Sequence, residues 1–310
     1  MTNRFAGYPA EITYNSGLNT LDLQQLSSFR IDPSANIIHQ TQMGSVDRSA
    51  SFIASAFPTI TIETMDLATV LAAVSLTAGL PVEAGVYNLQ HRQSGGIWYP
   101  TGDSQHVKFS SPLGFIEPQT IEAATEEQTE GAKLTMLHHT LWDGAEPTVD
   151  PLIRTATQNL TGMPVPAFNT QFFMGPISHN AAKVNGVKRF TYTAGFKTMK
   201  DIADGDYFPK TITIDERNPR LQFTATNAAL AAGLSEFLRA AGTWIVYLQK
   251  GNNGGHRVPR ATAEHISITF NTGVWRSEET SAQGTGDATS VYSAEIHDPP
   301  TINLATTIPI

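Results

Sequence analysis

The chain has 310 residues, of which 40% are hydrophobic and only 15% are charged. Charged residues usually make up about 25% of a globular domain, so we expect neighbouring subunits to cover much of this surface. The net charge of −8 argues against a nucleic-acid-binding protein, which needs a basic surface, and the absence of cysteine excludes disulfides, thiolate metal sites and cysteine nucleophiles.

The N-terminal segment MTNRFAGYPAE lacks a basic stretch followed by an apolar run, so the sequence predicts no signal peptide. The most apolar segment, 67–82, is shorter than the ~20 residues that a bilayer-spanning helix needs. We therefore expect a soluble protein that has no membrane partner and that is cytoplasmic or assembled from a cytoplasmic pool.

Residues 1–140 predict a mainly β domain with one flanking helix. Alternating apolar residues indicate strands, and the alanine-rich stretch after Asp66 indicates a helix with Asp66 as its N-cap and Gly79 as its end. The segment 18–57 is interpreted as one long loop. The predicted strands are 12–14, 59–63, 86–90, 106–110 and 133–138, and the predicted helix is 67–76.

Residues 187–296 predict a second domain of the same kind, reached through a partly ordered connector, 141–186. A helix is expected from Asn227 to Gly242, and the strands are interpreted as counterparts of those in the first domain. The extended segment 297–310 is predicted to be an arm, which needs a partner surface. The predicted strands of this domain are 190–192, 220–224, 245–249, 265–270 and 290–296.

Three sequence blocks recur in the same order, which predicts an internal duplication and hence two tandem homologous domains. The offset between partners falls from 178 in the first block to 161 in the second. The first copy is therefore expected to carry 17 extra residues between Gly17 and Pro58, within a loop. The blocks pair EITYNSGLNTL (11–21) with RFTYTAGFKTM (189–199), PTITIETMDLA from Pro58 with PRLQFTATNAA from Pro219, and VYNLQHRQSGG (86–96) with IVYLQKGNNGG (245–255).

Acidic residues are concentrated in the first half of the sequence. Residues 1–140 contain six basic and thirteen acidic side chains, whereas 187–310 contain twelve of each. The excess peaks within 117–130, for which two interpretations stand: a solvated loop, or a negative surface that repels DNA. The candidate lumen or interface residues are Glu117, Glu122, Glu126, Glu127 and Glu130.

The segment HHTLWDG, 138–144, resembles the HHxxxDG motif of condensation domains and of acyltransferases like chloramphenicol acetyltransferase. That resemblance implies that His139 is a general base. It covers seven residues only, and the end of a strand is a simpler explanation for them. We predict no catalytic, metal or cofactor site.

Two histidines at matching positions, His106 and His265, suggest a repeated metal ligand. Neither has several ligand-type neighbours at suitable spacing, so we interpret both as strand histidines with satisfied hydrogen bonds. The glycine-rich QSGG and GNNGG segments lack the lysine and the strand–loop–helix context of a phosphate-binding loop, and they predict hairpin turns.

The layout as a whole resembles the tail tube (major tail) proteins of long-tailed bacteriophages. The resemblance rests on β domains with a helix after PTITIETMDLATVLAA and PRLQFTATNAALAAG, on the long loop, on the terminal arm and on the low charge. It implies β-sandwich or barrel-like domains in rings whose inner strands close a β-barrel lumen. The long loop and the arms are then expected to stack the rings.

Most members of this family build a ring from six single domains, so a duplicated chain implies three subunits in a pseudo-hexameric ring. The resemblance implies a structural virion protein rather than an enzyme, assembled in the host cytoplasm. Its partners are then copies of itself, other tail proteins, and double-stranded DNA in transit. The alternatives are another virion component (a capsid decoration or tail adaptor), the HHxxxDG acyltransferase, and a carbohydrate-binding β-sandwich with Trp98, Tyr99 and Trp275 as its exposed aromatics.

Overall fold

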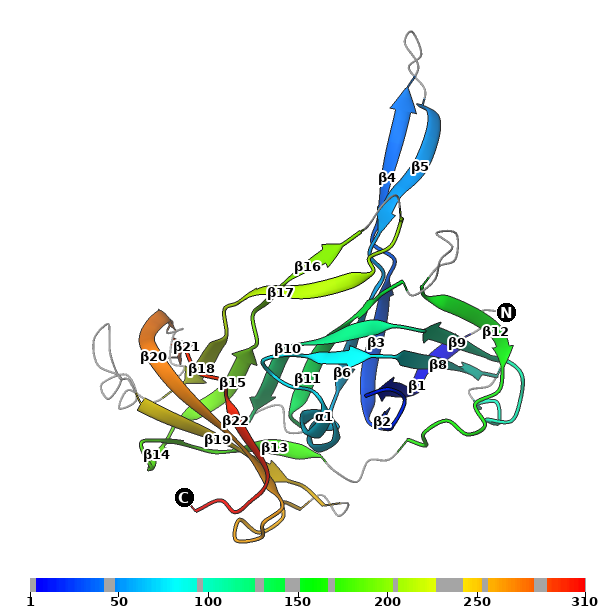
Figure 1. Ribbon diagram of the computed structural model, residues 1–310. Coiled ribbons are helices and arrows are strands. Elements are labelled where there is room, and N and C mark those ends of the chain that lie inside the picture. The colour runs from blue at the N-terminus through cyan, green and yellow to red at the C-terminus, as the bar shows by residue number, and fades with distance from the viewer. Residues whose placement is uncertain are drawn as a thin grey trace.

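The computed structural model shows a β-rich chain. It describes residues 4–41, 48–93, 97–125, 131–142, 151–166, 171–202, 206–226, 242–252, 256–281 and 289–309. These residues form twenty-two strands and one helix, which confirms the predicted mainly β class. The strands make one sheet of thirteen, one sheet of five and two separate two-stranded hairpins (Figure 1). Within the described ranges, no helix has the length and apolar character needed to cross a membrane.

The first half of the chain builds the five-stranded sheet and one end of the thirteen-stranded sheet. Apolar side chains from both sheets share a single core, to which the helix α1 contributes Leu67, Val70 and Leu71. The elements are β1 (Arg4–Tyr14), β2 (Asn19–Leu23), β3 (Leu26–Asp32), β4 (Ala35–Thr41), β5 (Arg48–Ala56), β6 (Thr59–Thr64), α1 (Leu67–Ala73), β7 (Leu80–Val82), β8 (Ala84–Arg92), β9 (His106–Ser111), β10 (Gly114–Ala124), β11 (Lys133–Thr140) and β12 (Ile153–Gln158).

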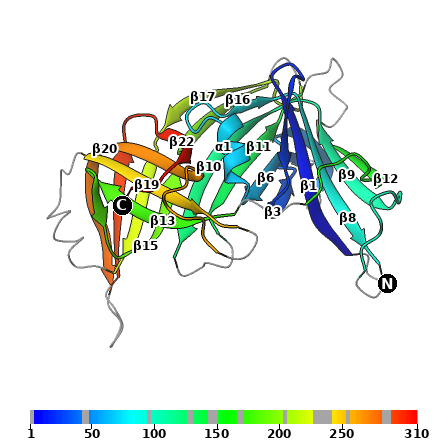
Figure 2. The ribbon, with the colours of Figure 1, turned by 90° about the horizontal axis from the view of Figure 1, so that it is seen from below.

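The second half supplies the rest of the long sheet, and it lies beside the first half when the molecule is seen from below (Figure 2). Its longest strand, β20, pairs with β19 and β22 near its start and with β21 near its end. The elements are β13 (Phe172–His179), β14 (Ala182–Val184), β15 (Val187–Thr193), β16 (Phe196–Asp201), β17 (Thr211–Arg217), β18 (Arg220–Ala225), β19 (Gly242–Lys250), β20 (His265–Ser281), β21 (Thr289–Ile296) and β22 (Thr301–Thr306).

Three segments interpreted as loop, connector and arm contain strands. The segment 18–57 holds β2, β3 and the hairpin β4–β5, which rises away from the rest of the chain (Figure 1). The connector 141–186 holds β12, β13 and β14, and β13 pairs with β19 in the long sheet. The arm 297–310 contains β22, which pairs with β20 of the same chain. Most of their partner strands lie far away in the sequence, so local composition did not reveal the pairing.

The predicted first helix is correct in position but ends early. It stops at Ala73, and Val74 is already extended, so Gly79 does not terminate it. Gly79 instead has a positive φ of 66°, and a Cβ there would lie 2.4 Å from the ring of Phe115. Asp66 occupies the N-cap position, where its carboxylate accepts a hydrogen bond from the Thr69 hydroxyl. The second predicted helix, 227–242, lies almost wholly outside the described residues.

Strand pairings of the first half recur in the second half with the same registers. The pairs β3–β6 and β15–β18 match at a shift of 161 residues (26 to 187), and both carry a bulge. The bulge lies between Leu26 and Ser28 in β3 and between Val187 and Arg189 in β15. A slip of one residue would move every side chain to the other face of the sheet. Two strand pairs that share both their register and the position of their bulge are therefore similar in a specific way.

The likeness extends to the later strands. Leu89 pairs with Val107 as Leu248 pairs with Ile266, a shift of 159 residues (89 to 248). The pair β10–β11 has its bulge after Pro118, and β20–β21 has one of its two bulges after the corresponding Ser277. In the first half a break at 112–113 separates β9 from β10, whereas β20 runs through the matching position. Proline at 112 lacks the N–H that a continuous ladder requires.

These registers correct the pairing of the first sequence block. Tyr14 lies on β1, which pairs with β2 and β8, whereas Tyr192 lies on β15, which pairs with β10 and β18. The strand that matches β15 is β3. The hairpins 35–56 and 196–217 then match end to end, so no 17-residue insertion separates the halves. A short Thr-Tyr-Gly pattern fits many strands, and only the pairing partner distinguishes them.

Candidate assembly junction

The two halves are joined edge to edge by the strands β10 and β15. Five residues of each strand pair in antiparallel register, from Thr120 opposite Thr193 to Ala124 opposite Arg189. Between them Ile121 and Tyr192 face each other, and both are fully buried. The junction therefore makes one continuous sheet from two β units, and it closes an edge on each of them.

The hairpin β16–β17 of the second half lies over the first half, as Figure 1 shows. The backbone N–H of Trp142 donates to the carbonyl of Pro209 over 2.8 Å, and the N–H of Ala56 donates to the carbonyl of Tyr207, also over 2.8 Å. The rings of Trp142 and Phe208 lie 6.2 Å apart. The hairpin thus adds a second contact between the halves, beside the shared strand edge.

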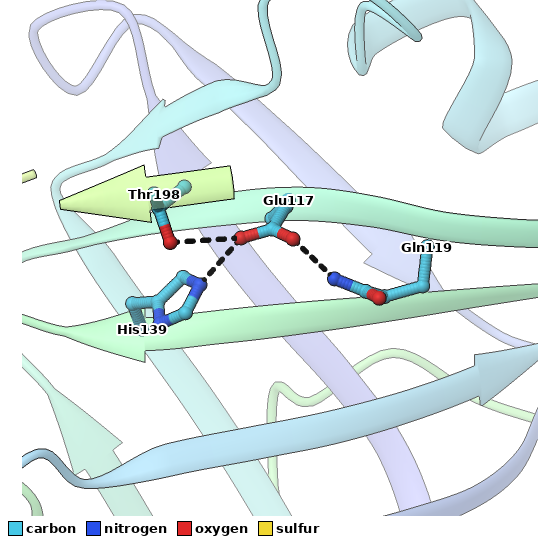
Figure 3. A network of polar contacts seen from close by, with 4 residues as sticks. All are labelled: Glu117, Gln119, His139 and Thr198. Atoms are coloured by element: carbon cyan, nitrogen blue, oxygen red, sulfur yellow. Dashed lines mark hydrogen bonds and ion pairs between the residues drawn. The ribbon is translucent and has the colours of Figure 1, made fainter. Parts of the chain in front are cut away.

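A buried polar network lies beneath this hairpin (Figure 3). Glu117 on β10 accepts hydrogen bonds from His139 Nε2 over 2.8 Å, from the Thr198 hydroxyl over 3.4 Å, and from the side-chain amide of Gln119. The side chains of Glu117 and His139 are 5% and 4% exposed. A buried carboxylate needs such donors, and Thr198 brings one of them from the other half.

Lys200, two residues after Thr198 on β16, adds a cation to the junction. Its ammonium lies 5.1 Å from the centre of the Phe57 ring. Burial lowers the pKa of Lys200, while the nearby Glu117 carboxylate acts in the opposite direction. The hairpin therefore brings a hydrogen-bond donor and a cation close to Glu117 of the first half.

His138 is enclosed in the core of the first half. Its Nδ1 lies 2.6 Å from the Tyr87 hydroxyl, and a Cβ on Gly114 would lie 2.1 Å from its Nε2. Burial, followed by the proximity of His139, lowers the pKa of His138 to about 3, so the ring is neutral at physiological pH. Burial also raises the pKa of Tyr87.

The geometry of the HHTLWDG segment differs from what the acyltransferase resemblance implies. A general base must reach its substrate, but His139 is 3% exposed and its Nε2 is held by Glu117. The motif positions Asp143 and Gly144 lie outside the described residues. The two histidines are thus neighbours at a strand end that packs against the second half.

Of the five candidate acidic residues, the structure describes two, Glu117 and Glu122, both on β10. Glu117 is buried within the network that His139, Gln119 and Thr198 form around it. Glu122 is half-buried on β10, opposite Lys133 of β11 on one side and Thr191 of β15 on the other. The remaining candidates, Glu126, Glu127 and Glu130, lie outside the described residues.

His106 and His265 have the same structural role, as predicted. In each, Nδ1 accepts a backbone N–H over 3.1 Å and Nε2 lies 3.0 Å from a proline carbonyl, which satisfies both nitrogens of the Nε2-protonated ring. In the described part of the chain no group of three or more His, Asp or Glu residues is placed to hold a metal ion. The donors are His91 and Lys250, and the carbonyls are those of Pro100 and Pro259.

Of the candidate carbohydrate-binding aromatics, the structure describes the side chains of Trp98 and Tyr99, which contact different residues. Trp98 is 40% exposed and lies under the Arg92 guanidinium, 5.4 Å from it. Tyr99 is half-buried and stacks on His91 at 4.9 Å. The side chain of Trp275 lies outside the described part.

The polar partners Gln119 and Thr198 were not among the candidate residues. No sequence pattern distinguishes them from other strand polar residues, because their role depends on a fold-back of the second half. No model of a known protein family matches this chain, and comparison with curated proteins finds no similar sequence.

Proposed function

We propose that this chain is a structural subunit of a bacteriophage tail tube, an internally duplicated form in which three chains make a pseudo-hexameric ring. The observation that carries the proposal is the β10–β15 pairing, which joins two like β units side by side in one sheet. If the same edge-to-edge contact is repeated between chains, the β units can form a ring.

The recurring registers support a tandem duplication of one β unit. The β10–β15 contact is head to tail, because it uses different strands of the two units. A contact of this type closes into a ring when its rotation permits, and otherwise it gives a helical filament. Six units from three chains give the ring that the resemblance to tail tube proteins implies.

The composition fits a subunit that is covered by its neighbours. Charged residues are 15% of the chain and the net charge is −8. A channel with a negative surface repels DNA and gains nothing from counterion release, so DNA passes without adhering. The proposed partners are therefore other copies of this chain and other tail proteins, with DNA in transit, in a virion assembled in the host cytoplasm.

A capsid decoration or a tail adaptor is the second candidate, because both also assemble by closing sheet edges. The projecting hairpin β4–β5 favours the tube, since a stacked ring needs a contact along the axis (Figure 1). The two candidates differ in what they build: a decoration or an adaptor makes single rings or isolated trimers.

Negative-stain electron microscopy of the purified chain over a range of concentrations tests the proposal, together with native mass spectrometry. We expect rings of three chains with a central channel that stack into tubes as concentration rises. Single rings at every concentration would favour the adaptor or decoration. A monomer throughout would contradict both.

A further inference from the structure

We propose that β3 of one chain pairs with the C-terminal part of β20 of a second copy, in the register that β10 and β15 adopt within one chain. This inference rests on the assembly in the proposed function, and it names the partner, the strands and the residue pairs. It follows from the recurring registers, which assign a counterpart to each strand of the internal junction.

The first free edge belongs to β3. Its counterpart β15 is paired on both sides, with β18 and with β10. Within the described residues, β3 pairs with β6 alone and ends the thirteen-stranded sheet. Ser28, Arg30 and Asp32 along β3 are exposed. An open strand edge of this length readily pairs with another chain.

The second free edge belongs to the C-terminal part of β20. Its counterpart β10 pairs with β11 on one side and with β15 on the other. From Val274 to Ser281, β20 pairs with β21, and the structure gives it no other strand among the described residues. The backbone ladder that β10 completes within the chain is therefore left open on β20.

The register of the new contact follows from the internal one. A residue of β10 corresponds to the residue of β20 whose number is 159 higher (122 to 281). A residue of β15 corresponds to the residue of β3 whose number is 161 lower (191 to 30). The internal pair of Glu122 and Thr191 thus becomes Ser281 of one chain opposite Arg30 of the next. In the same way Thr280 lies opposite Ile31, and Glu279 lies opposite Asp32.

The side-chain types at these positions fit a strand contact of intermediate strength. In this register Arg30 is diagonal to Glu279, so a basic and an acidic residue occupy neighbouring positions of the proposed pair. Ile31 already packs against the core of its own half, as Tyr192 does at the internal junction. Asp32 directly opposite Glu279 is a like-charge pair, which opposes the contact.

Cysteine pairs test this register cleanly because the chain has no cysteine of its own. The test variant carries Ser281→Cys and Arg30→Cys, and it is oxidised with copper phenanthroline at a concentration that gives rings. The positive control carries Glu122→Cys and Thr191→Cys at the internal junction. The off-register control carries Thr280→Cys and Arg30→Cys, whose side chains are on opposite faces and cannot approach disulfide distance.

The expected result is a shift from monomer to covalent dimers and trimers on a non-reducing gel for the test variant. The internal control should cross-link within single chains, and the off-register control should stay monomeric. Each single-cysteine variant, examined by microscopy, reports whether the substitution alone prevents assembly.

The outcomes separate this inference from the proposed function. Rings without cross-links in the test variant would overturn the register while leaving the tube proposal in place. Covalent trimers that never stack into tubes would support the register and contradict the tube. If neither rings nor cross-links form while the internal control cross-links, both are wrong.

Discussion

Two hairpins of equal span, β4–β5 and β16–β17, occupy matching places in the two halves but have different surroundings. Along β16 exposure alternates, with Thr198 and Lys200 half-buried and Met199 exposed between them. Along β4, by contrast, every residue from 35 to 40 is exposed. The hairpin β16–β17 has the first half beneath it, whereas β4–β5 projects alone (Figure 1).

The difference shows that exposure here depends on the neighbour and not on the polarity of the strand. The projecting hairpin is the more apolar of the two and has large apolar side chains on both of its faces. Exposed apolar side chains that lie together usually mark a surface that contacts another molecule. In the assembly proposed here, the missing neighbour is the second half of an adjacent chain or a ring stacked above. These side chains are Ile37, Ile38, Phe52 and Ile53, between 41% and 51% exposed.

The largest expected effect comes from a substitution in the network that the hairpin β16–β17 covers. Glu117→Ala removes the acceptor of His139, Thr198 and Gln119, so three donors at the junction lose this partner. Leaving a buried hydrogen-bonding group without its partner costs about 1–3 kcal/mol, and we expect a loss of about that size in the free energy of unfolding. Urea denaturation measures it, with Glu122→Ala on the same strand as the control. Equal losses in the two variants would contradict a special role for the network.

Acid should weaken the fold through the buried side chain of His138. The pKa of His138 is about 3 in the folded chain and near 6.5 when unfolded, so the unfolded chain binds more protons between these values. Stability therefore falls as the pH falls through this window, by about 2 kcal/mol from pH 7 to pH 5 for this residue. His138→Asn should flatten that part of the profile in thermal melts at several pH values. An unchanged slope would show that His138 is not the group responsible.

The exposed hairpin, β4–β5, can be altered without unfolding the chain. Phe52→Ser with Ile53→Ser replaces two exposed side chains of β5, so the unfolding free energy should change by about 0.5 kcal/mol or less. If the hairpin is covered on assembly, the concentration needed for rings or tubes should rise about tenfold, which corresponds to 1.4 kcal/mol. Sedimentation and microscopy measure this. Met199→Ser, on the exposed face of β16, is the matched control.

The smallest expected effect comes from a charge on β3, and it tests whether β3 pairs with another chain in the register that β15 has within the chain. Asp32→Asn removes one charge of the proposed like-charge pair, yet it keeps the side-chain oxygen that accepts the Ser34 N–H. Like charges directly opposite cost up to about 1 kcal/mol, so the variant should assemble at up to about fivefold lower concentration. Glu279→Gln should have the same effect, and the two together should add little. A weaker assembly in Asp32→Asn would argue against the proposed register.

The sequence predicted the elements whose signals are local. The strands around 59–63, 86–90, 106–110 and 220–224 lie where the alternating pattern indicated them, and the first helix begins after Asp66. The strands within 18–57 and 141–186 were missed, because strands such as β3 and β13 pair with residues 27 to 78 positions away in the sequence.

The junction was harder to predict than the strands. Glu117 was selected for its charge, but its burial depends on His139 and on Thr198 from the other half. The sequence places His139 at the end of a strand, but the motif-like residues around it give no sign of its contact with Glu117. The second block shows the shift of 161 residues that also relates β3 to β15, whereas the similarity of residues 11–21 to 189–199 at a shift of 178 obscures that relation.

The uninterrupted run of β20 has a mechanical consequence. One strand of seventeen residues serves the pairing with β19 and β22 at one end and the pairing with β21 at the other. Sliding it along its axis at one end therefore requires breaking hydrogen bonds at the other end as well. The first half divides the same path at Pro112 into two strands. Under mechanical force we therefore expect the second half to resist bending along β20, whereas the first half should bend at residues 112–113.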